Sequence, residues 1–222
     1  MNDGATDSVL VTSTISVAAL NDAPVIVTAT TTLSTLEDTA TSFVISTQLS
    51  GNVTDADGTA LNAIGIWQNT STNGTWAYST DSGATWTNFP VSLASVPNGT
   101  GVMYLNATDS LRFTPAANAN GTAIGSLDYR AIDATFGTYT SGTLVNTNTN
   151  YGGTGAVSLA HGYINIDVTA VNDAPINTMP TSQISNEDAT KAITALRVAD
   201  VDDNGGNMTV TLTVQNGSIA VL

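Results

Sequence analysis

The sequence predicts an all-β protein built from tandem β-sandwiches. Threonine is the commonest residue type, at 38 of 222 residues, and Val, Ile, Ser, Asn and Gly are also frequent. β-Branched side chains fit the pleated surface of a sheet, whereas Gly and Asn favour turns. Strong helix formers are scarce, since Lys and Arg together number only 4. The tandem arrangement is predicted by an internal repeat.

Short apolar runs separated by turn residues predict the strands of the central region. They are Phe43-Val44-Ile45, Ile64 to Trp67, Leu111-Arg112-Phe113 and Leu127 to Ile132. Such spacing is typical of a β-sandwich, whose usual size is about 100 residues. The predicted unit is longer. We expect the additional residues in a Trp-rich hairpin region from Trp67 to Phe89 and in a long polar loop over 140–161.

The repeat begins with a six-residue motif. Ala19-Leu20-Asn21-Asp22-Ala23-Pro24 recurs 151 residues later as Ala170-Val171-Asn172-Asp173-Ala174-Pro175. Each copy follows an alternating apolar run and precedes a Glu-Asp pair, Glu37-Asp38 and then Glu187-Asp188. An acidic turn comes next, containing Asp55 and Asp57 in the first unit and Asp200 and Asp202 in the second. Three ordered matches indicate repeated domains.

The repeats divide the chain into one complete domain and two partial ones. We interpret residues 1–20 as the C-terminal strands of a preceding repeat and 21–24 as a linker. Residues 25–171 form the complete domain, 172–175 form a second linker, and 176–222 open a following repeat. This division predicts a segment of a longer tandem array.

Charge and composition exclude several functions. The formal net charge is -14, with 18 acids, 4 bases, one His and no Cys. Four bases cannot neutralise a nucleic-acid backbone, and an anionic membrane surface would repel the chain. Without Cys there is no disulfide or thiolate, and one His leaves little basis for a catalytic triad. We therefore expect no enzyme, no nucleic-acid partner and no membrane insertion.

The Asn-Asp-Ala-Pro linker, the Glu-Asp pair and the Asp-x-Asp turn together resemble the cadherin-like repeats of large bacterial surface adhesins. The resemblance implies Ig/cadherin-like β-sandwiches at the cell surface, whose partners are neighbouring repeats of the same chain. It also implies Ca²⁺ at the domain junctions. The ligands implied for the upstream junction are Asn21, Asp22, Asp55, Asp57 and Asp133, and those for the downstream junction are Glu37, Asp38, Asn172, Asp173, Asp200 and Asp202. Glu187 and Asp188 would serve a third junction.

Electrostatics supports these ions independently of the resemblance. Calcium takes 6–8 oxygen ligands, several of them carboxylates, and most acids of this chain have no base to pair with. Carboxylates gathered at a junction repel one another until a cation bridges them. Alanine replaces two polar linker positions of animal cadherins, at 19 and 23 and again at 170 and 174. We expect fewer than three ions per junction.

Two alternative functions remain open from the sequence. Trp67, Trp76, Tyr78, Trp86 and Tyr104 could form a glycan-binding platform, which exposed rings would favour and buried rings would argue against. Head-to-tail assembly into a homopolymer by strand donation could join residues 1–20 of one copy to 176–222 of another.

The remaining motifs have structural interpretations. Ser79 to Trp86 matches the Asp-box pattern, in which we expect Asp81 to cap a tight hairpin over the Trp. For His161 we expect a satisfied or exposed imidazole. Arg112 and Arg130 are expected to pair with acids or to cover apolar surface.

Overall fold

The computed structural model describes residues 4, 9–58, 61–90, 101–148, 150–203 and 205–221. Strands dominate it, and its one described α-helix, α1 (Ile45–Leu49), has a single turn. The prediction of an all-β protein is confirmed. The helix was not expected: it follows β3 directly and buries Ile45 and Leu49. Burial of those two apolar side chains accounts for a helix of β-branched and polar residues too short to be stable alone.

The larger sheet has six strands in the order β11-β8-β5-β10-β12-β2. They span Thr143–Val145, Val102–Asn106, Ala63–Asn69, Gly121–Ile132, Gly162–Thr169 and Thr30–Leu36 in that order. Neighbouring strands are antiparallel except β12 and β2, which are parallel over seven residue pairs from Tyr163↔Thr30 to Thr169↔Leu36. This pairing places the C-terminal ends of β2 and β12 side by side, at the end of the body where the second linker begins.

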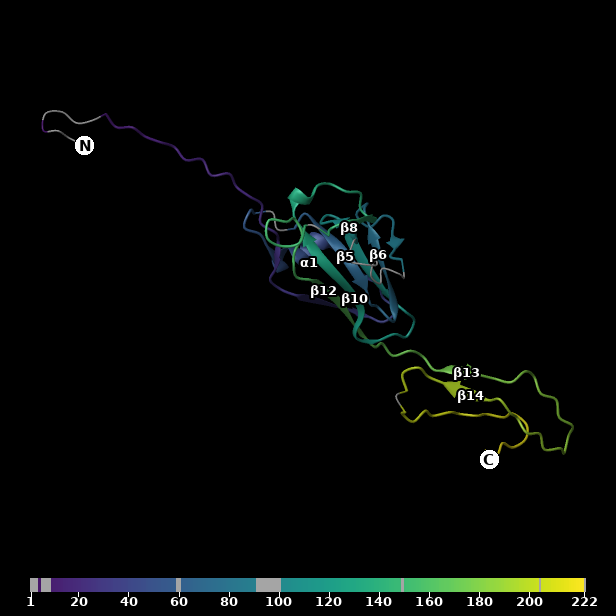
Figure 1. The fold of residues 1–222 in the computed structure, drawn as a ribbon. Helices are drawn as coiled ribbons and strands as arrows, with labels where there is room; N and C mark the ends of the chain where they lie inside the picture. The colour runs from purple at the N-terminus through teal and green to yellow at the C-terminus, as the bar shows by residue number, and fades with distance from the viewer. Residues whose placement is uncertain are drawn as a thin grey trace.

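The smaller sheet has four strands in the order β3-β9-β6-β7, all antiparallel. They span Thr41–Val44, Ser110–Pro115, Gly74–Ser79 and Thr87–Asn88. The predicted runs lie in β3, β5, β9 and β10, although the first run ends early because Ile45 begins the helix. Figure 1 shows the strands of these two sheets gathered in one body, from which the two ends of the chain leave in opposite directions.

One hydrophobic core joins both sheets. Alternate residues of β5, β10 and β12 contribute Ile64, Leu127 and Ile164, all fully buried. The smaller sheet contributes Trp76 and Phe113, whose rings lie 5.2 Å apart between centroids. The period-2 alternation read from the sequence therefore directs apolar side chains between the sheets.

A second cluster lies on the opposite face of the larger sheet. Val102 and Tyr104 of β8 are fully buried there and belong to one cluster with Val145 and Val157. Both valines come from the stretch predicted to be a long loop. The stretch includes a strand, β11, and Val157 bridges to Ile132. An edge strand and a bridged turn thus replace part of the predicted loop, because its valines cover apolar residues of the sheet.

The two terminal segments contrast with this body. Residues 9–20 contain no strand, and Val9, Leu10 and Val11 are 85–88% exposed. Over 176–203 and 205–221 the described strands are β13 (Ile176–Thr178) and β14 (Arg197–Ala199), and no described residue is fully buried. Of the first predicted segment, residues 1–3 and 5–8 lie outside the described residues, as do Asn204 and Leu222 of the last.

The backbone repeats at both linkers. After the first, β1 (Val25–Ile26) pairs antiparallel with β4 (Val53–Thr54), joining Val25 to Thr54. After the second, β13 pairs antiparallel with β14, joining Ile176 to Ala199. The Glu-Asp pairs also share an unusual conformation, since φ is +59° at Asp38 and +57° at Asp188. Equivalent residues thus make equivalent turns and pairs in the two units.

Candidate metal centre at the second linker

Glu37 is held at the end of β2 by the neighbouring strand. Its backbone N–H donates to the carbonyl of Thr169, the last residue of β12, at 3.0 Å. Its side chain is only 2% exposed. One carboxylate oxygen accepts from the N–H of Val171, and the other accepts from Nδ2 of Asn120 at 3.3 Å. The parallel pairing of β2 with β12 therefore fixes this acid beside the linker.

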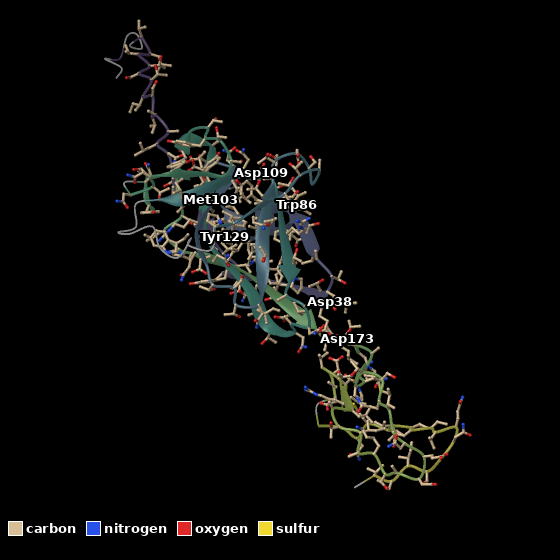
Figure 2. The ribbon with its side chains drawn as sticks, turned by 90° about the vertical axis from the view of Figure 1, so that its right-hand side faces the viewer. Asp38, Trp86, Met103, Asp109, Tyr129 and Asp173 are labelled. Atoms are coloured by element: carbon tan, nitrogen blue, oxygen red, sulfur yellow. The ribbon has the colours of Figure 1, made fainter. Side chains whose placement is uncertain are left out.

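Asp173 approaches Glu37 from the linker. Its N–H donates to Oδ2 of Asp202 at 2.5 Å, and the N–H of Asp202 donates to Oδ1 of Asp200 at 2.9 Å. Carboxylate oxygens of Glu37, Asp173 and Asp202 all lie within 4.8 Å of one another. Figure 2 shows Asp38 and Asp173 where the body meets the segment that follows it. Three parts of the chain therefore meet in what we call the junction cluster: Glu37, Asp173 and Asp202.

Asp173 has an electrostatically unfavourable position. Oδ2 of its carboxylate is buried and has no hydrogen-bond donor. The pKa of Asp173 is raised above its ordinary value, first by burial and then by the charges of Asp202, Asp38, Glu37 and Asp200. A buried acceptor facing other acids costs free energy unless a cation or donor satisfies it. The cluster is thus a candidate site for a hard cation.

The first linker has a related arrangement. The N–H of Asp22 donates to Oδ2 of Asp57 at 2.6 Å, and the N–H of Asp57 donates to Oδ1 of Asp55 at 2.8 Å. Asp133, only 2% exposed, accepts from Nδ2 of Asn21 at 3.1 Å and caps a 3₁₀ turn through the N–H of Thr135. The linker N–H contacts the Asp-x-Asp turn in the same way at both junctions.

The two junctions differ in the hydrogen bonds of their linker asparagines and in the grouping of their acids. At the first, the amide of Asn21 also donates to the carbonyls of Gly155 and Asp22. At the second, Asn172 donates only locally among the recorded hydrogen bonds, to the carbonyl of Asp173. Within the described chain, close grouping of three acids occurs only at the second junction. The resemblance implies a carbonyl or amide oxygen of the linker Asn as a ligand; the amide nitrogens donate to Asp133 in the case of Asn21 and to the carbonyl of Asp173 in the case of Asn172.

Two residues that contact the junctions were not predicted from the sequence. Asn120 reaches Glu37 from the turn before β10, 83 positions away. The carbonyl of Gly155 reaches the first linker from the stretch that covers the larger sheet. A backbone carbonyl carries no sequence signal. Asn120 precedes Gly121, a pairing that marks a turn but not the turn's neighbours.

The five aromatic residues of the suggested glycan platform lie in separate surroundings. Trp76 is fully buried between the sheets, and Tyr104 is fully buried on the opposite face of the larger sheet. Trp67 packs beside that second cluster, and Tyr78 packs against the main core. The guanidinium carbon of Arg112 lies 4.4 Å from the ring centre of Trp86. The rings do not form one exposed surface.

The Asp-box turn has the expected capping. Asp81 accepts from the N–H of Thr85 at 2.8 Å, from its hydroxyl at 2.6 Å and from the hydroxyl of Ser79 at 2.7 Å. These donors, the Thr85 hydroxyl first, lower the pKa of Asp81 to about 2. Gly83 has φ +92°, as the turn requires.

Arg112, Arg130 and His161 contact carbonyls, aromatic rings or one another, and none has an acid among its recorded contacts. Arg130 donates to the carbonyls of Ser158 and Leu159 and lies over the ring of Tyr151. Its Nη2 lies 2.6 Å from Nε2 of His161. Burial first, and then the charge of Arg130, lower the pKa of His161. The expectation of a satisfied imidazole is confirmed, and Arg112 and Arg130 each lie over an aromatic ring.

Searches against protein families, curated proteins and solved structures found no match for this chain. Among its described helices, none is long and apolar enough to cross a membrane.

Proposed function

We propose that the chain is a calcium-stiffened structural repeat of an extracellular bacterial adhesin, with ions at the junctions between cadherin-like β-sandwiches. The observation that carries this proposal is the junction cluster. Its oxygens lie within 4.8 Å of one another, and the buried Oδ2 of Asp173 has no donor. The proposed role is mechanical spacing and needs no catalysis.

The separation of the oxygens suits a hard divalent cation. Calcium binds oxygens at 2.3–2.6 Å, so two of its ligands lie at most roughly 5 Å apart. Glu37, Asp173 and Asp202 would be ligands, with Asp38 and Asp200 close enough to influence Asp173 electrostatically. When bound, the ion supplies the positive charge that these acids lack. Calcium is favoured over magnesium because irregular carboxylate clusters tolerate its flexible coordination.

Binding at this place would restrict the linker. Glu37 belongs to the body, Asp173 to the linker and Asp202 to the following segment. A cation joining all three would hold the following segment in a fixed direction, because each ligand restricts a different piece of backbone. Extracellular calcium modules bind in the range of about 10⁻⁴–10⁻³ M, which suits a rigid spacer outside the cell.

Thermal unfolding of the full chain in EGTA and in millimolar calcium tests this proposal. We expect calcium to raise Tm, because an ion that binds only the folded form stabilises it by mass action. Chelation should reverse the shift, and magnesium at the same concentration should give less. An identical Tm in EGTA and calcium, together with no heat of calcium binding, would refute the proposal.

A further inference from the structure

Asn120 lies in direct contact with the buried acid of the junction cluster. Its Nδ2 donates to Oε2 of Glu37 at 3.3 Å. The other oxygen of Glu37 is occupied by the N–H of Val171. Asn120 and the next residue, Gly121, are both exposed, although the acid that they contact is only 2% exposed. The cluster thus has one neutral polar neighbour that solvent can reach.

We propose that Asn120 is a site of spontaneous deamidation, and that its conversion to a carboxylate adds a fourth acid to the junction cluster. The effect on cation binding rests on the function proposed above, but the modification does not. Asn followed by Gly is the pairing in which the backbone most readily reaches the side-chain carbonyl, because Gly has no Cβ to hinder the approach.

The reaction requires only water. The backbone nitrogen of Gly121 attacks Cγ of Asn120, and the new C–N bond closes a five-membered imide. The bond from Cγ to Nδ2 breaks, and that nitrogen leaves as ammonia with the proton from Gly121. Water then opens the imide at one of its two carbonyls, which gives aspartate or isoaspartate. Aspartate carries its carboxylate on Cγ, where the amide had been. Isoaspartate carries it on the former backbone carbonyl carbon, and its peptide bond to Gly121 runs through Cγ.

The local backbone distinguishes Asn120 from another Asn-Gly pair. Gly121 has φ +132°, and a Cβ there would come no closer than 3.3 Å to Ile124. Gly74, which follows Asn73, is paired with Pro115 inside the smaller sheet. A Cβ on Gly74 would come within 2.2 Å of Phe113. Gly121 is itself paired, with Val168 at the start of β10, but the register shifts before the next pair at Gly125, whereas the pairing that follows Gly74 is regular. Imide formation moves the backbone of both residues, so the sheet should protect Asn73 more than Asn120.

Conversion to aspartate would reverse the contact with Glu37. The amide donates a hydrogen bond to Glu37, whereas a carboxylate would repel it at the same distance. The cluster should then be less stable without a cation and bind calcium more tightly. A spacer modified in this way would become stiffer with age at a given calcium concentration.

The modification is tested by ageing the full chain in calcium-free buffer near pH 8 and mapping its peptides by mass spectrometry with isoaspartate detection. Asn120 should convert faster than Asn73. The exposed Asn216-Gly217 pair is the positive control for the chemistry. Conversion of Asn216 without conversion of Asn120, or equal rates at 120 and 73, would overturn the proposal.

The consequence is tested on Asn120→Asp, with Asn120→Gln as an amide that cyclises poorly and Asn73→Asp as the charge control. Calorimetry with CaCl₂ should give an affinity for Asn120→Asp about tenfold tighter than wild type. Its Tm in EGTA should be lower. Asn73→Asp should show neither change, and Asn120→Gln should show no gain in calcium affinity. Unchanged affinity and Tm in Asn120→Asp would overturn the inference while calcium binding by wild type upholds the proposed function. Absence of calcium binding by wild type and by every variant would refute that function, and the Tm in EGTA would still report the contact with Glu37.

Discussion

The Asp-box turn and the junction cluster are two acidic parts of the molecule with opposite electrostatics. At the turn, Asp81 accepts three hydrogen bonds from Thr85 and Ser79, and its pKa falls to about 2. At the junction, Asp173 has a buried oxygen with no donor, and burial and neighbouring acids raise its pKa. Donors within the turn satisfy the carboxylate of Asp81, whereas no donor satisfies Oδ2 of Asp173 at the junction.

This difference shows why counting acids is a poor guide to metal sites. Asp81 follows an acid-poor strand and is satisfied by residues within four positions of itself. Asp173 gathers acids from 29 and 136 positions away in the sequence, Asp202 and Glu37, and no nearby donor covers its Oδ2. Whether donors or other acids surround a carboxylate separates a structural acid from a candidate ligand.

The largest expected effect is at Glu37. Replacing it with Gln removes a charge from the cluster but keeps its size and its contact with Val171. We expect calcium affinity to fall at least about 100-fold, because even indirect supports of metal ligands are often worth 10–100-fold. Calorimetry measures this. Asp109→Asn, at another buried acid, is the control and should bind calcium like wild type; equal loss in both would indicate a general folding defect.

The effect of Asp173→Asn on Tm should change sign when calcium is added. In calcium-stripped buffer near pH 7 we expect a higher Tm than wild type, since the raised pKa means that the charged carboxylate destabilises the folded form. The stability of wild type relative to the variant should rise as pH falls through the folded pKa of Asp173, where its carboxyl becomes protonated. With saturating calcium the variant should have the lower Tm. A variant less stable than wild type in stripped buffer near pH 7 contradicts this electrostatic account.

Asp81→Ala, unlike Asp173→Asn, should lower Tm in calcium-free buffer, and calcium should not alter its effect. Because the folded pKa of Asp81 is about 2, its stabilisation is present above the ordinary pKa and is lost as pH falls through about 2. We expect Tm to drop by a few degrees near pH 7, and by less in strong acid. The drop should be the same in EGTA and in calcium. Thermal melts across this pH range provide the measurement.

The smallest effect is expected at Asp22, the counterpart of Asp173 in the first linker. Asp22→Asn should leave the calcium affinity of the junction cluster within about twofold of wild type, since sites without shared partners behave additively. The N–H of residue 22 still donates to Asp57. Calorimetry on the pair Asp22→Asn and Asp173→Asn makes the comparison, and similar losses in both would show that the junctions are coupled.

Local pattern predicted the strands well and the contacts between distant segments poorly. The runs at Ile64, Leu111 and Leu127 all lie in strands, because alternation alone decides which face is buried. The resemblance to cadherin-like repeats implied that Glu37, Asp173 and Asp202 share a junction, and their carboxylate oxygens lie within 4.8 Å of one another. Asn120 was missed because its position depends on how the turn before β10 meets the end of β2. The helix was missed because Ile45 and Leu49 form it only by packing into the core.

The parallel pairing of β2 and β12 has a consequence for tension. β2 is reached from the first linker at its N-terminal end, and β12 continues into the second linker from its C-terminal end. A pull applied between the two linkers therefore draws the strands past each other along their length. The force shears the seven paired positions from Thr30 to Leu36 together. Their hydrogen bonds must therefore break at the same time and not one after another.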